Sequence, residues 1–396
     1  MDDCLIVGGG VIGLSIAREL AGRGVRVRVV SREVGRATAS WAAAGIFPPA
    51  PESVGASAAD RLTAWSDRLH TRWSDELRAE TGIDNELRRC GGLHVAASDA
   101  AIARLMAAAE SWRGRGASCT WLDAAGVEAH EPGLRPAVAR GGVRAGFLLP
   151  DERSLRPPRH LEALVASCRR RGVTILNDAV HGVEFDDGRI TAVATAAGVV
   201  RAGAYCFAAG AWAGDILARL GHRLETRPIR GQILLLRLPR PRLDRVVNFG
   251  IDYLVPRPDG RLLVGSTIED AGFEATTTPA AIERLRNVAD RLLGELPDAE
   301  PEHAWAGLRP GSVDGLPTLG PLPGIANGYV AAGHFRAGLH QSTGTAVLLA
   351  DLITGATSAC DPAPFSPARR LDGNAGSAPR PGSVADYLDR ARDTAA

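Results

Sequence analysis

Three glycines near the start of the chain carry the first chemical signal. Gly8, Gly10 and Gly13 have the G-x-G-x-x-G spacing, between an apolar run at 4–7 and a helix-like stretch. The first permits a tight turn, the second lets a pyrophosphate approach the backbone, and the third lets the helix pack on the strand. The helix N-terminus then favours phosphate charge. An ordinary glycine-rich turn is the alternative, but a second strand over 25–30 favours dinucleotide binding.

The end of that second strand says less about which dinucleotide binds. An acid is expected there to hold the ribose hydroxyls, but position 31 is a serine. Either the Ser31 hydroxyl or Glu33, two residues on, is available to the ribose, and Arg32 is available to a phosphate. A solvated turn is an equally good interpretation of these residues. The missing acid argues against NAD more strongly than against a flavin dinucleotide.

The composition excludes several other classes of protein. The chain has 396 residues, enough for two or three domains, and 45% of them are apolar. Its formal net charge is +1 with acids and bases interspersed, which is no signature of binding to nucleic acid or to an anionic membrane. All 46 basic residues are arginines, so no lysine is available for a Schiff base or for pyridoxal phosphate.

Cysteine usage indicates a reducing compartment. The six cysteines are scattered without a C-x-x-C pair, which argues against a disulfide framework and a zinc site. We find neither a basic and apolar leader nor an apolar run of about 18 residues. The sequence therefore predicts a soluble cytoplasmic protein with no membrane span, no metal and no nucleic-acid partner.

The remaining pattern places the glycine turn in an α/β framework. Amphipathic spacing predicts helices over 58–81 and 99–113, and Asp123 is a suitable N-cap for a third helix. Strands that run into glycine return near 205–210 and 329–333, as in a doubly wound nucleotide-binding domain. A separate antiparallel sheet is expected from four short strands, at 233–238, 245–249, 253–256 and 262–267.

Three other segments complete this framework. Small residues over 35–49 allow a flat ring system to lie against the backbone, and Gly45 with two prolines argues against a long helix there. Residues 186–188 read Asp-Asp-Gly, which is a hairpin signal. Proline, glycine, serine and arginine dominate from 360 to 382, which is typical of a loop, and a short helix is predicted over 384–392.

Two motifs near the C-terminus, WAGLRP over 305–310 and GHFRAG over 333–338, are the most specific in the chain. Six segments accompany them: the glycine turn, SWAAAGI at 40–46, AAGAW at 208–212, RGQ at 230–232, YLVPR at 253–257 and VGSTIE at 264–269. With these segments the chain resembles the D-amino-acid-oxidase-like FAD-dependent oxidoreductases, and within them the glycine oxidases of thiamine biosynthesis. The resemblance covers about residues 3–356.

The resemblance implies an α/β fold with two domains. One is a Rossmann-like FAD-binding domain and the other is a substrate domain built on an antiparallel sheet, as in glutathione reductase and D-amino-acid oxidase. The FAD-binding domain is expected to be discontinuous, over 1–50, 141–225 and 304–356. The substrate domain takes 51–140 and 226–303, and 357–396 remain as a proline- and glycine-rich tail.

Non-covalent FAD is the cofactor that the resemblance implies. Its expected contacts at the pyrophosphate turn are Gly8, Gly10, Val11, Ile12 and Gly13. Those at the adenosine are Ser31, Arg32 and the backbone of Val180. Those at the flavin are Ala39, Ser40, Ala44, Gly45 and Ile46, with Gly210 as a further contact. Those at the pyrimidine edge are His334, Phe335, Arg336, Ala337, Gly338, Leu339 and His340. Many relatives have small or aliphatic residues where this chain has His340-Gln341-Ser342.

Tyr253, Arg309 and Arg336 are expected to face the substrate. Burying the carboxylate of an amino acid unpaired would be costly, and an arginine fork matches it with two parallel hydrogen bonds. Arg309 is the first choice, with the Tyr253 hydroxyl as a second donor. A structural ion pair for Arg309 and a core aromatic for Tyr253 are the alternatives, and the resemblance favours the functional roles.

The implied reaction is oxidative deamination of glycine or a similar small amino acid, such as sarcosine or a small D-amino acid. It yields a 2-oxo acid, ammonia and, with dioxygen, hydrogen peroxide, and would supply thiazole synthesis for thiamine. No general base is evident, because His334 beside a glycine turn is more typical of a structural residue. The partners expected are substrate and dioxygen, and a homo-oligomer is left open.

Three other functions compete with this one. A monomeric sarcosine oxidase would hold its flavin on a cysteine and use a lysine, and this chain has no lysine. A D-amino-acid dehydrogenase, which passes electrons to a quinone or carrier, stays open. A non-catalytic FAD-binding protein also stays open, although the presence of Arg309, Arg336 and Tyr253 argues against it.

Overall fold

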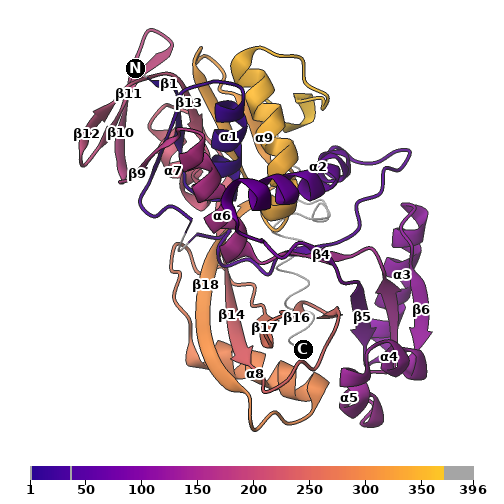
Figure 1. Cartoon of the computed structure of the whole chain (residues 1–396). Helices are drawn as coiled ribbons and strands as arrows, with labels where there is room; N and C mark the ends of the chain where they lie inside the picture. The colour runs from indigo at the N-terminus through magenta and orange to yellow at the C-terminus, as the bar shows by residue number, and fades with distance from the viewer. Residues whose placement is uncertain (1, 36–37, 370–396) are drawn as a thin grey trace.

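The computed structural model describes residues 2–35 and 38–369, and the chain forms two halves that lie one above the other (Figure 1). The upper half is built on a parallel sheet and the lower half on a largely antiparallel one. Among the described residues, no helix combines the length and the apolar character that crossing a membrane requires.

The first strand, β1 (Asp2–Val7), lies inside a six-stranded sheet with the order β19-β20-β13-β1-β2-β9. Its neighbours β13 and β2 run parallel to it, and only β19 at the edge is antiparallel. The other strands are β2 (Val27–Ser31), β9 (Thr174–Asn177), β13 (Ala202–Phe207), β19 (Thr318–Pro321) and β20 (Gly328–Ala332). The carboxyl ends of the parallel strands therefore share one edge, where ligands bind in such sheets.

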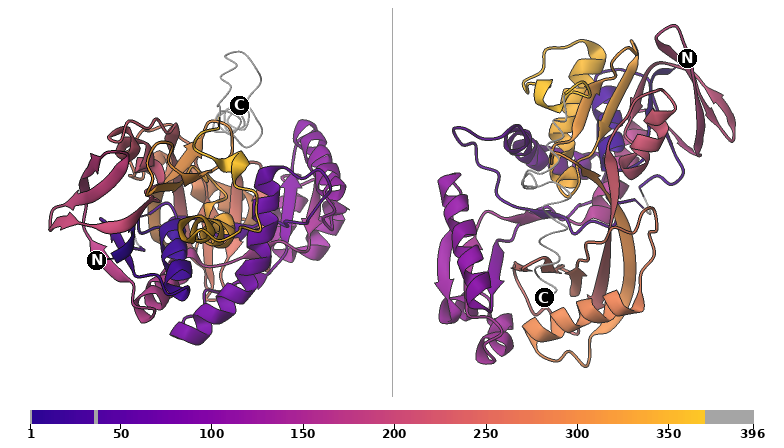
Figure 2. Two further views of the ribbon diagram at one scale, coloured as in Figure 1. Left: turned by 90° about the horizontal axis from the view of Figure 1, so that it is seen from above. Right: turned by 180° about the vertical axis from the view of Figure 1, so that it is seen from behind.

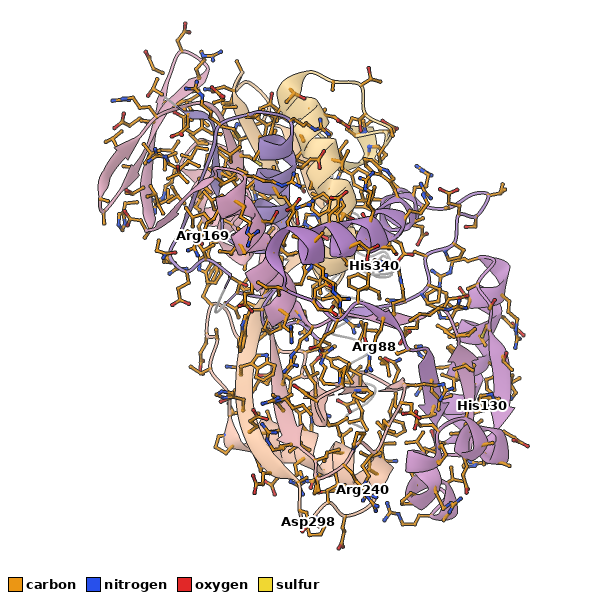
Figure 3. All side chains as sticks on the ribbon, in the orientation of Figure 1. Arg88, His130, Arg169, Arg240, Asp298 and His340 are labelled. Carbon is orange, nitrogen blue, oxygen red and sulfur yellow. The ribbon has the colours of Figure 1, made fainter. Side chains whose placement is uncertain are left out.

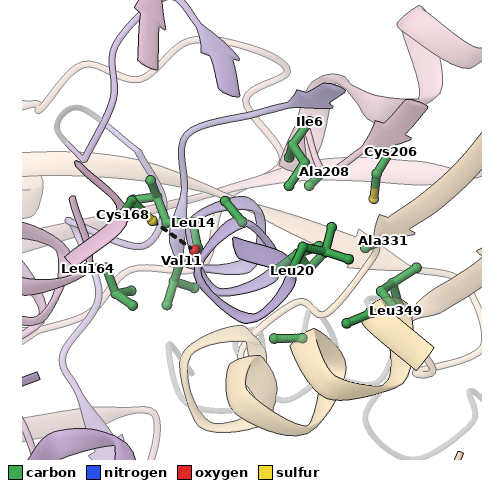
Figure 4. Packing of buried hydrophobic residues seen from close by; sticks show 14 of the residues in the cluster. Ile6, Val11, Leu14, Leu20, Leu164, Cys168, Cys206, Ala208, Ala331 and Leu349 are labelled. Carbon is green, nitrogen blue, oxygen red and sulfur yellow. Dashed lines mark hydrogen bonds between the residues drawn. The ribbon is translucent and has the colours of Figure 1, made fainter. Parts of the chain in front are cut away.

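Helices α1 (Val11–Gly22) and α9 (Gly338–Thr354) pack against one face of this sheet. Helix α6 (Pro157–Arg170) packs on α1, and α2 (Ala58–Thr81) packs on α9 and α6. Their apolar faces share one buried cluster, of which Figure 4 shows the part around α1. There Leu20 lies beside Leu349 of α9, and Leu14 lies beside Cys168 of α6, whose thiol donates to the Leu14 carbonyl at 3.4 Å.

The opposite face carries a second core and a small antiparallel sheet. That sheet consists of β10 (Val180–Asp186), β11 (Arg189–Thr195) and β12 (Gly198–Val200). As the sequence predicts, β10 and β11 form a hairpin, in which Asp187 and Gly188 have φ angles of 40° and 69°. The 3-10 turn Gly210–Trp212 and α7 (Ala213–Ala218) follow β13.

The lower half contains an eight-stranded sheet with the order β18-β14-β17-β16-β15-β5-β7-β6. Its longest strands, β14 (Thr226–Arg237) and β18 (Glu300–Ser312), pair along their full length. The others are β5 (Gly92–Ala96), β6 (Thr120–Asp123), β7 (Ala145–Leu149), β15 (Val246–Phe249), β16 (Asp252–Pro256) and β17 (Arg261–Gly265). The four strands predicted from the sequence are present, although β14 begins earlier and is long. Their sheet is larger than predicted, because β18, β5, β7 and β6 extend it and β15 pairs with β5 in parallel.

Helices flank this sheet, as the view from behind in Figure 2 shows for α8. They are α3 (Asp99–Gly114), α4 (Ala124–His130), α5 (Arg135–Ala139) and α8 (Pro279–Leu293). The predicted N-cap is confirmed, since the Asp123 carboxylate accepts from the Gly126 N–H at 2.8 Å. At the junction of the halves, β3 (Ile46–Phe47), β8 (Arg153–Ser154) and β4 (Arg88–Arg89) form a short sheet.

The structure differs in three places from the expected division into domains. Helix α2, expected in the substrate domain, packs in the upper half because Leu62, Trp73 and Leu77 share the core of α1 and α9. Strand β7, expected with the FAD-binding residues 141–225, pairs with β5 and β6 of the lower sheet. Strand β18, expected with 304–356, pairs with β14. The remaining boundaries stay predictions.

The C-terminal segment is described only in part. Of the predicted tail, residues 357–369 contain one 3-10 turn, Ala363–Phe365. The side chain of Phe365 is buried in the same core as α9. The helix predicted over 384–392 lies outside the described residues.

Candidate cofactor and active site

A cavity of about 890 Å³ lies where the two halves meet. Its lining comes from the loops after β1, β2, β13 and β20 in the upper half, and from β14, β16 and β18 in the lower half. This volume is near the upper end of the range for ligand pockets, about 300–1,000 Å³. The cavity therefore lies between the carboxyl edge of the parallel sheet and the eight-stranded sheet of the lower half.

The glycine turn after β1 lies tightly against the end of β13. Gly8 has φ 126°, and a Cβ at this position would stand 2.2 Å from the Ala208 carbonyl oxygen. A Cβ at Gly13 would stand 2.0 Å from the Gly8 carbonyl oxygen, so the third glycine serves helix–strand packing, as its spacing indicates. Gly8, Gly10, Val11 and Ile12 line the cavity, whereas Gly13 does not.

The start of α1 offers backbone donors to the cavity. Its N-cap is Gly10, which makes no side-chain cap, and the Val11 N–H donates to the Ser40 hydroxyl at 3.0 Å. Helix α9 also begins at the cavity, with Gly338 and Leu339 in its lining. Two helix N-termini therefore aim their positive dipole ends at this space, which suits an anionic ligand.

At the end of β2, Ser31, Arg32 and Glu33 all line the cavity. The Ser31 hydroxyl donates to the Glu33 carbonyl oxygen at 3.1 Å, and the Arg32 guanidinium lies 4.9 Å from the centre of the Trp212 ring. Val180 and Gly210 line the same space.

The segment of small residues lines the middle of the cavity through Ala39, Ser40, Ala44, Gly45 and Ile46. It forms turns and the short strand β3 rather than a long helix, as predicted. A Cβ at Gly45 would stand 2.1 Å from the Leu155 carbonyl oxygen, so its backbone lies tightly against the residues before α6.

A buried arginine that has no role in the sequence-based site holds this segment. The Arg257 guanidinium donates to the carbonyl oxygens of Ala44 at 2.7 Å and Leu155 at 2.9 Å. Burial lowers its pKa to about 10. Arg257 ends the YLVPR motif, but nothing in that motif indicates a contact 213 residues away in the sequence.

Tyr253 and Arg309 line the cavity from the lower sheet. The Tyr253 ring is buried against Gly265, where a Cβ would stand 2.4 Å from the ring. The partners of Arg309 include the Ser266 hydroxyl at 2.8 Å and the Thr267 carbonyl oxygen at 3.2 Å. These oxygens orient the guanidinium at the cavity, and a guanidinium can bind a carboxylate through two parallel hydrogen bonds.

The residues after β20 close the cavity from the C-terminal side. The Phe335 N–H donates to the Pro310 carbonyl oxygen at 2.9 Å, next to Arg309. His334, Phe335, Arg336, Gly338, Leu339 and His340 line the space, and Arg336 is exposed. Ala337, the N-cap residue of α9, is absent from the lining.

His334 is a buried structural residue. Its Nε2 lies 3.1 Å from the Thr345 hydroxyl, and burial lowers the pKa of its ring to about 3. The ring is therefore neutral at physiological pH and pairs with a side chain of α9, the helix that follows it. His340 is different: it lines the cavity, and its Nε2 lies 2.7 Å from a carboxylate oxygen of Asp67. Figure 3 shows His340 at the level where the halves meet.

Comparison with known proteins identifies the family. The family model described as FAD dependent oxidoreductase (DAO) matches residues 3–352. The chain belongs to the DAO family of FAD-dependent oxidoreductases. The family resemblance predicted from the sequence is thus confirmed, as is the α/β fold with a parallel Rossmann-like sheet and a substrate sheet. This DAO-family chain is a glycine-oxidase-like, FAD-dependent amino acid oxidase.

Glycine oxidases are prominent among the relatives of this DAO-family chain. That of Pseudomonas aeruginosa is 37% identical over 369 residues, which cover 93% of this chain and 99% of the relative. The crystal structure of glycine oxidase from Geobacillus kaustophilus superposes with a TM-score of 0.87 at 32% identity, covering 93% of this chain and 99% of the other. Iminodiacetate oxidase from Chelativorans sp. BNC1 superposes with a TM-score of 0.81 at 27% identity, covering 92% and 98%.

Proposed function

We propose that the chain binds FAD non-covalently in the 890 Å³ cavity and oxidises glycine or a similarly small amino acid, with dioxygen as the electron acceptor. The observation that carries this proposal is that Arg309 and Tyr253 line the same cavity as the glycine turn and the N-terminus of α9. A carboxylate-binding pair and a dinucleotide cradle thus face one another.

FAD supplies the redox chemistry, as an acceptor of two electrons from the substrate carbon. The glycine turn and the first N–H groups of α1 would hold its pyrophosphate, and the segment 39–46 would lie against its ring. The fit rests on glycines whose Cβ atoms would clash with backbone, at Gly8 and Gly45, and on the size of the cavity.

The side chains of the lower sheet bind and orient the substrate. Arg309, fixed by Ser266 and Thr267, would pair with the substrate carboxylate without first paying to order its own side chain. The Tyr253 hydroxyl would add a second donor. Because His334 is neutral and paired with Thr345, the proposal assigns it no proton transfer, and the amine binds as the free base.

The substrate is tested by measuring peroxide from glycine, sarcosine, D-alanine and D-proline with the purified, FAD-loaded chain. Glycine or another member of this small set is expected to give the highest kcat/KM. A preference for bulky D-amino acids would overturn the substrate assignment. Reduction of an artificial dye without peroxide would instead favour the dehydrogenase.

A supply of thiazole precursors for thiamine is the cellular role that we propose with this activity. Its support is the resemblance to glycine oxidases. Deleting the gene in its own organism is expected to create a requirement for thiazole or thiamine. Normal growth of the deletion strain without either compound would overturn this role, while leaving the enzymatic activity in place.

A further inference from the structure

His340 is a titratable side chain that the proposed reaction does not use. It is the third residue of α9, lines the cavity and is 5% exposed. Its ring stacks on Phe47 with centroids 4.4 Å apart and an interplanar angle of 13°. His340 therefore belongs both to the buried packing around β3 and to the lining of the cavity.

Charged and titratable groups approach His340 from three elements. From α2, the Asp67 carboxylate lies 2.7 Å from Nε2, and His70 Nε2 lies 2.8 Å from the His340 carbonyl oxygen. From β8, Arg153 pairs with Asp67. From α6, His160 lies behind His70, with ring centroids 6.3 Å apart. Asp67 is 25% exposed, so the pair connects the cavity with solvent.

The chemistry of these partners fixes the tautomer of His340. An ionised carboxylate only accepts hydrogen bonds, and the hydrogen bonds to His340 and Arg153 outweigh burial and lower the pKa of Asp67. Nε2 of His340 therefore carries the hydrogen, and Nδ1 is the basic atom. Burial lowers the pKa of the ring, so His340 is neutral near pH 7. It is ready to gain a proton if negative charge develops beside it.

We propose that His340 takes up a proton at Nδ1 when the bound flavin is reduced, with Asp67 as the residue that positions the ring and balances its charge. The inference rests on the proposed binding of FAD. Two electrons and one proton leave the flavin with one negative charge, and a second proton from solvent then forms the imidazolium of His340. The reductant supplies both electrons, and no further reactant is needed.

The test is the pH dependence of the two-electron midpoint potential of the FAD-loaded chain. Each proton taken up shifts this potential by about 30 mV per pH unit, so two protons give about 59 mV between about pH 7 and 8. The native chain is expected to show the larger slope, and His340→Leu the smaller one. Asp67→Asn, which keeps the ring but removes its charged partner, is expected to reduce the slope as well.

His70→Gln is the matched control, because its amide can still donate to the His340 carbonyl, and it should keep the two-proton slope. The FAD dissociation constant of each variant is measured alongside. A one-proton slope in the native chain, or a two-proton slope in His340→Leu, would overturn the inference. If His340→Leu fails to fold, the native chain and Asp67→Asn still decide.

No amino acid is used in this experiment, so the two proposals fail separately. A two-proton slope in a chain that oxidises no amino acid would overturn only the proposed substrate activity. A one-proton slope in an active oxidase would overturn only the role of His340. A chain that binds no FAD would overturn both.

Discussion

The guanidinium group of Arg309 lies against the Cα atom of Gly231 on the neighbouring strand. A Cβ at position 231 would stand 2.2 Å from both Nη atoms. Ser266 and Thr267 hold the same group from the adjoining strand end. A side chain at position 231 would therefore displace the guanidinium from the position in which the proposed substrate carboxylate meets it.

The variant Gly231→Ala tests this relationship. Displacing Arg309 is expected to cost about one charge-assisted hydrogen bond, about 1.5 kcal/mol, which raises KM for glycine about tenfold. Steady-state peroxide assays measure KM, and FAD titration shows whether the cofactor is retained. Gly182→Ala is the matched control, because its Cβ would make ordinary contact at 3.6 Å with the Ala194 side chain. An unchanged KM in Gly231→Ala contradicts the account.

Arg309→Ala should have a larger effect on the same constant. Loss of the guanidinium removes hydrogen bonds to a charged group worth about 1.5–3 kcal/mol, so KM for glycine should rise about 10- to 100-fold. The FAD dissociation constant should change far less. Arg309→Lys keeps the charge without the planar fork, so its KM for glycine should lie between those of the native protein and Arg309→Ala. If KM stays at the native value in Arg309→Ala, Arg309 is not part of the substrate site.

Gly8→Ala should abolish FAD binding while the chain still folds. The added Cβ would meet the Ala208 carbonyl oxygen at 2.2 Å, and φ 126° is rarely adopted by residues with a side chain. The turn must shift, and the N–H groups at the start of α1 shift with it. Visible absorbance of the purified protein reports bound flavin, and circular dichroism reports folding. A folded, fully yellow Gly8→Ala protein would show that the turn does not hold the cofactor.

The carboxyl group of Asp259 is expected to make the free energy of unfolding depend on pH in the acid range. Burial raises its pKa, but hydrogen bonds to Arg156 and Arg261 outweigh burial and lower that pKa from 3.8 to about 2. A carboxyl group whose pKa is lower in the folded state stabilises the fold above its unfolded pKa, and this stabilisation is lost as pH falls from about 4 to 2.

Asp259→Asn should therefore lower the free energy of unfolding by about 0.5–1 kcal/mol at neutral pH and flatten the acid limb of its pH profile. Urea unfolding at several pH values measures both effects. Asp186→Asn, at an exposed hairpin position, serves as the control. Parallel acid limbs for the native and Asp259→Asn proteins would contradict this assignment.

The sequence predicts where helices and strands lie better than it predicts what they pack against, and α2 shows why. Its amphipathic spacing gives the bounds 58–81, which the structure has. The spacing identifies an apolar face but does not identify the surface that covers it. Leu62, Trp73 and Leu77 instead pack with α1 and α9 in the parallel half. The covering surface is set by contacts distant in sequence, which periodicity cannot show.

The same limit applies to the candidate site. The glycine turn can be predicted from the sequence because its geometry is local to six residues. The structure places Gly8 and Gly13 where their spacing requires. The roles of Asp67 and Arg257 cannot be predicted in this way. Asp67 contacts His340, 273 positions away in the sequence, and Arg257 contacts Ala44, 213 positions away. Arg257 is one of 46 basic residues, all of them arginines, and Asp67 is one of 45 acidic residues, so neither residue type stands out.

The central claim is that FAD and a small amino acid meet in the cavity that Arg309 and Tyr253 line. It is tested most directly by hydrogen peroxide production from glycine, sarcosine, D-alanine and D-proline, with the native and Arg309→Ala proteins both loaded with FAD. The account predicts peroxide from at least one of these substrates, and a much higher KM for it in the variant. A native protein that binds FAD but forms no peroxide from any of them would contradict the account.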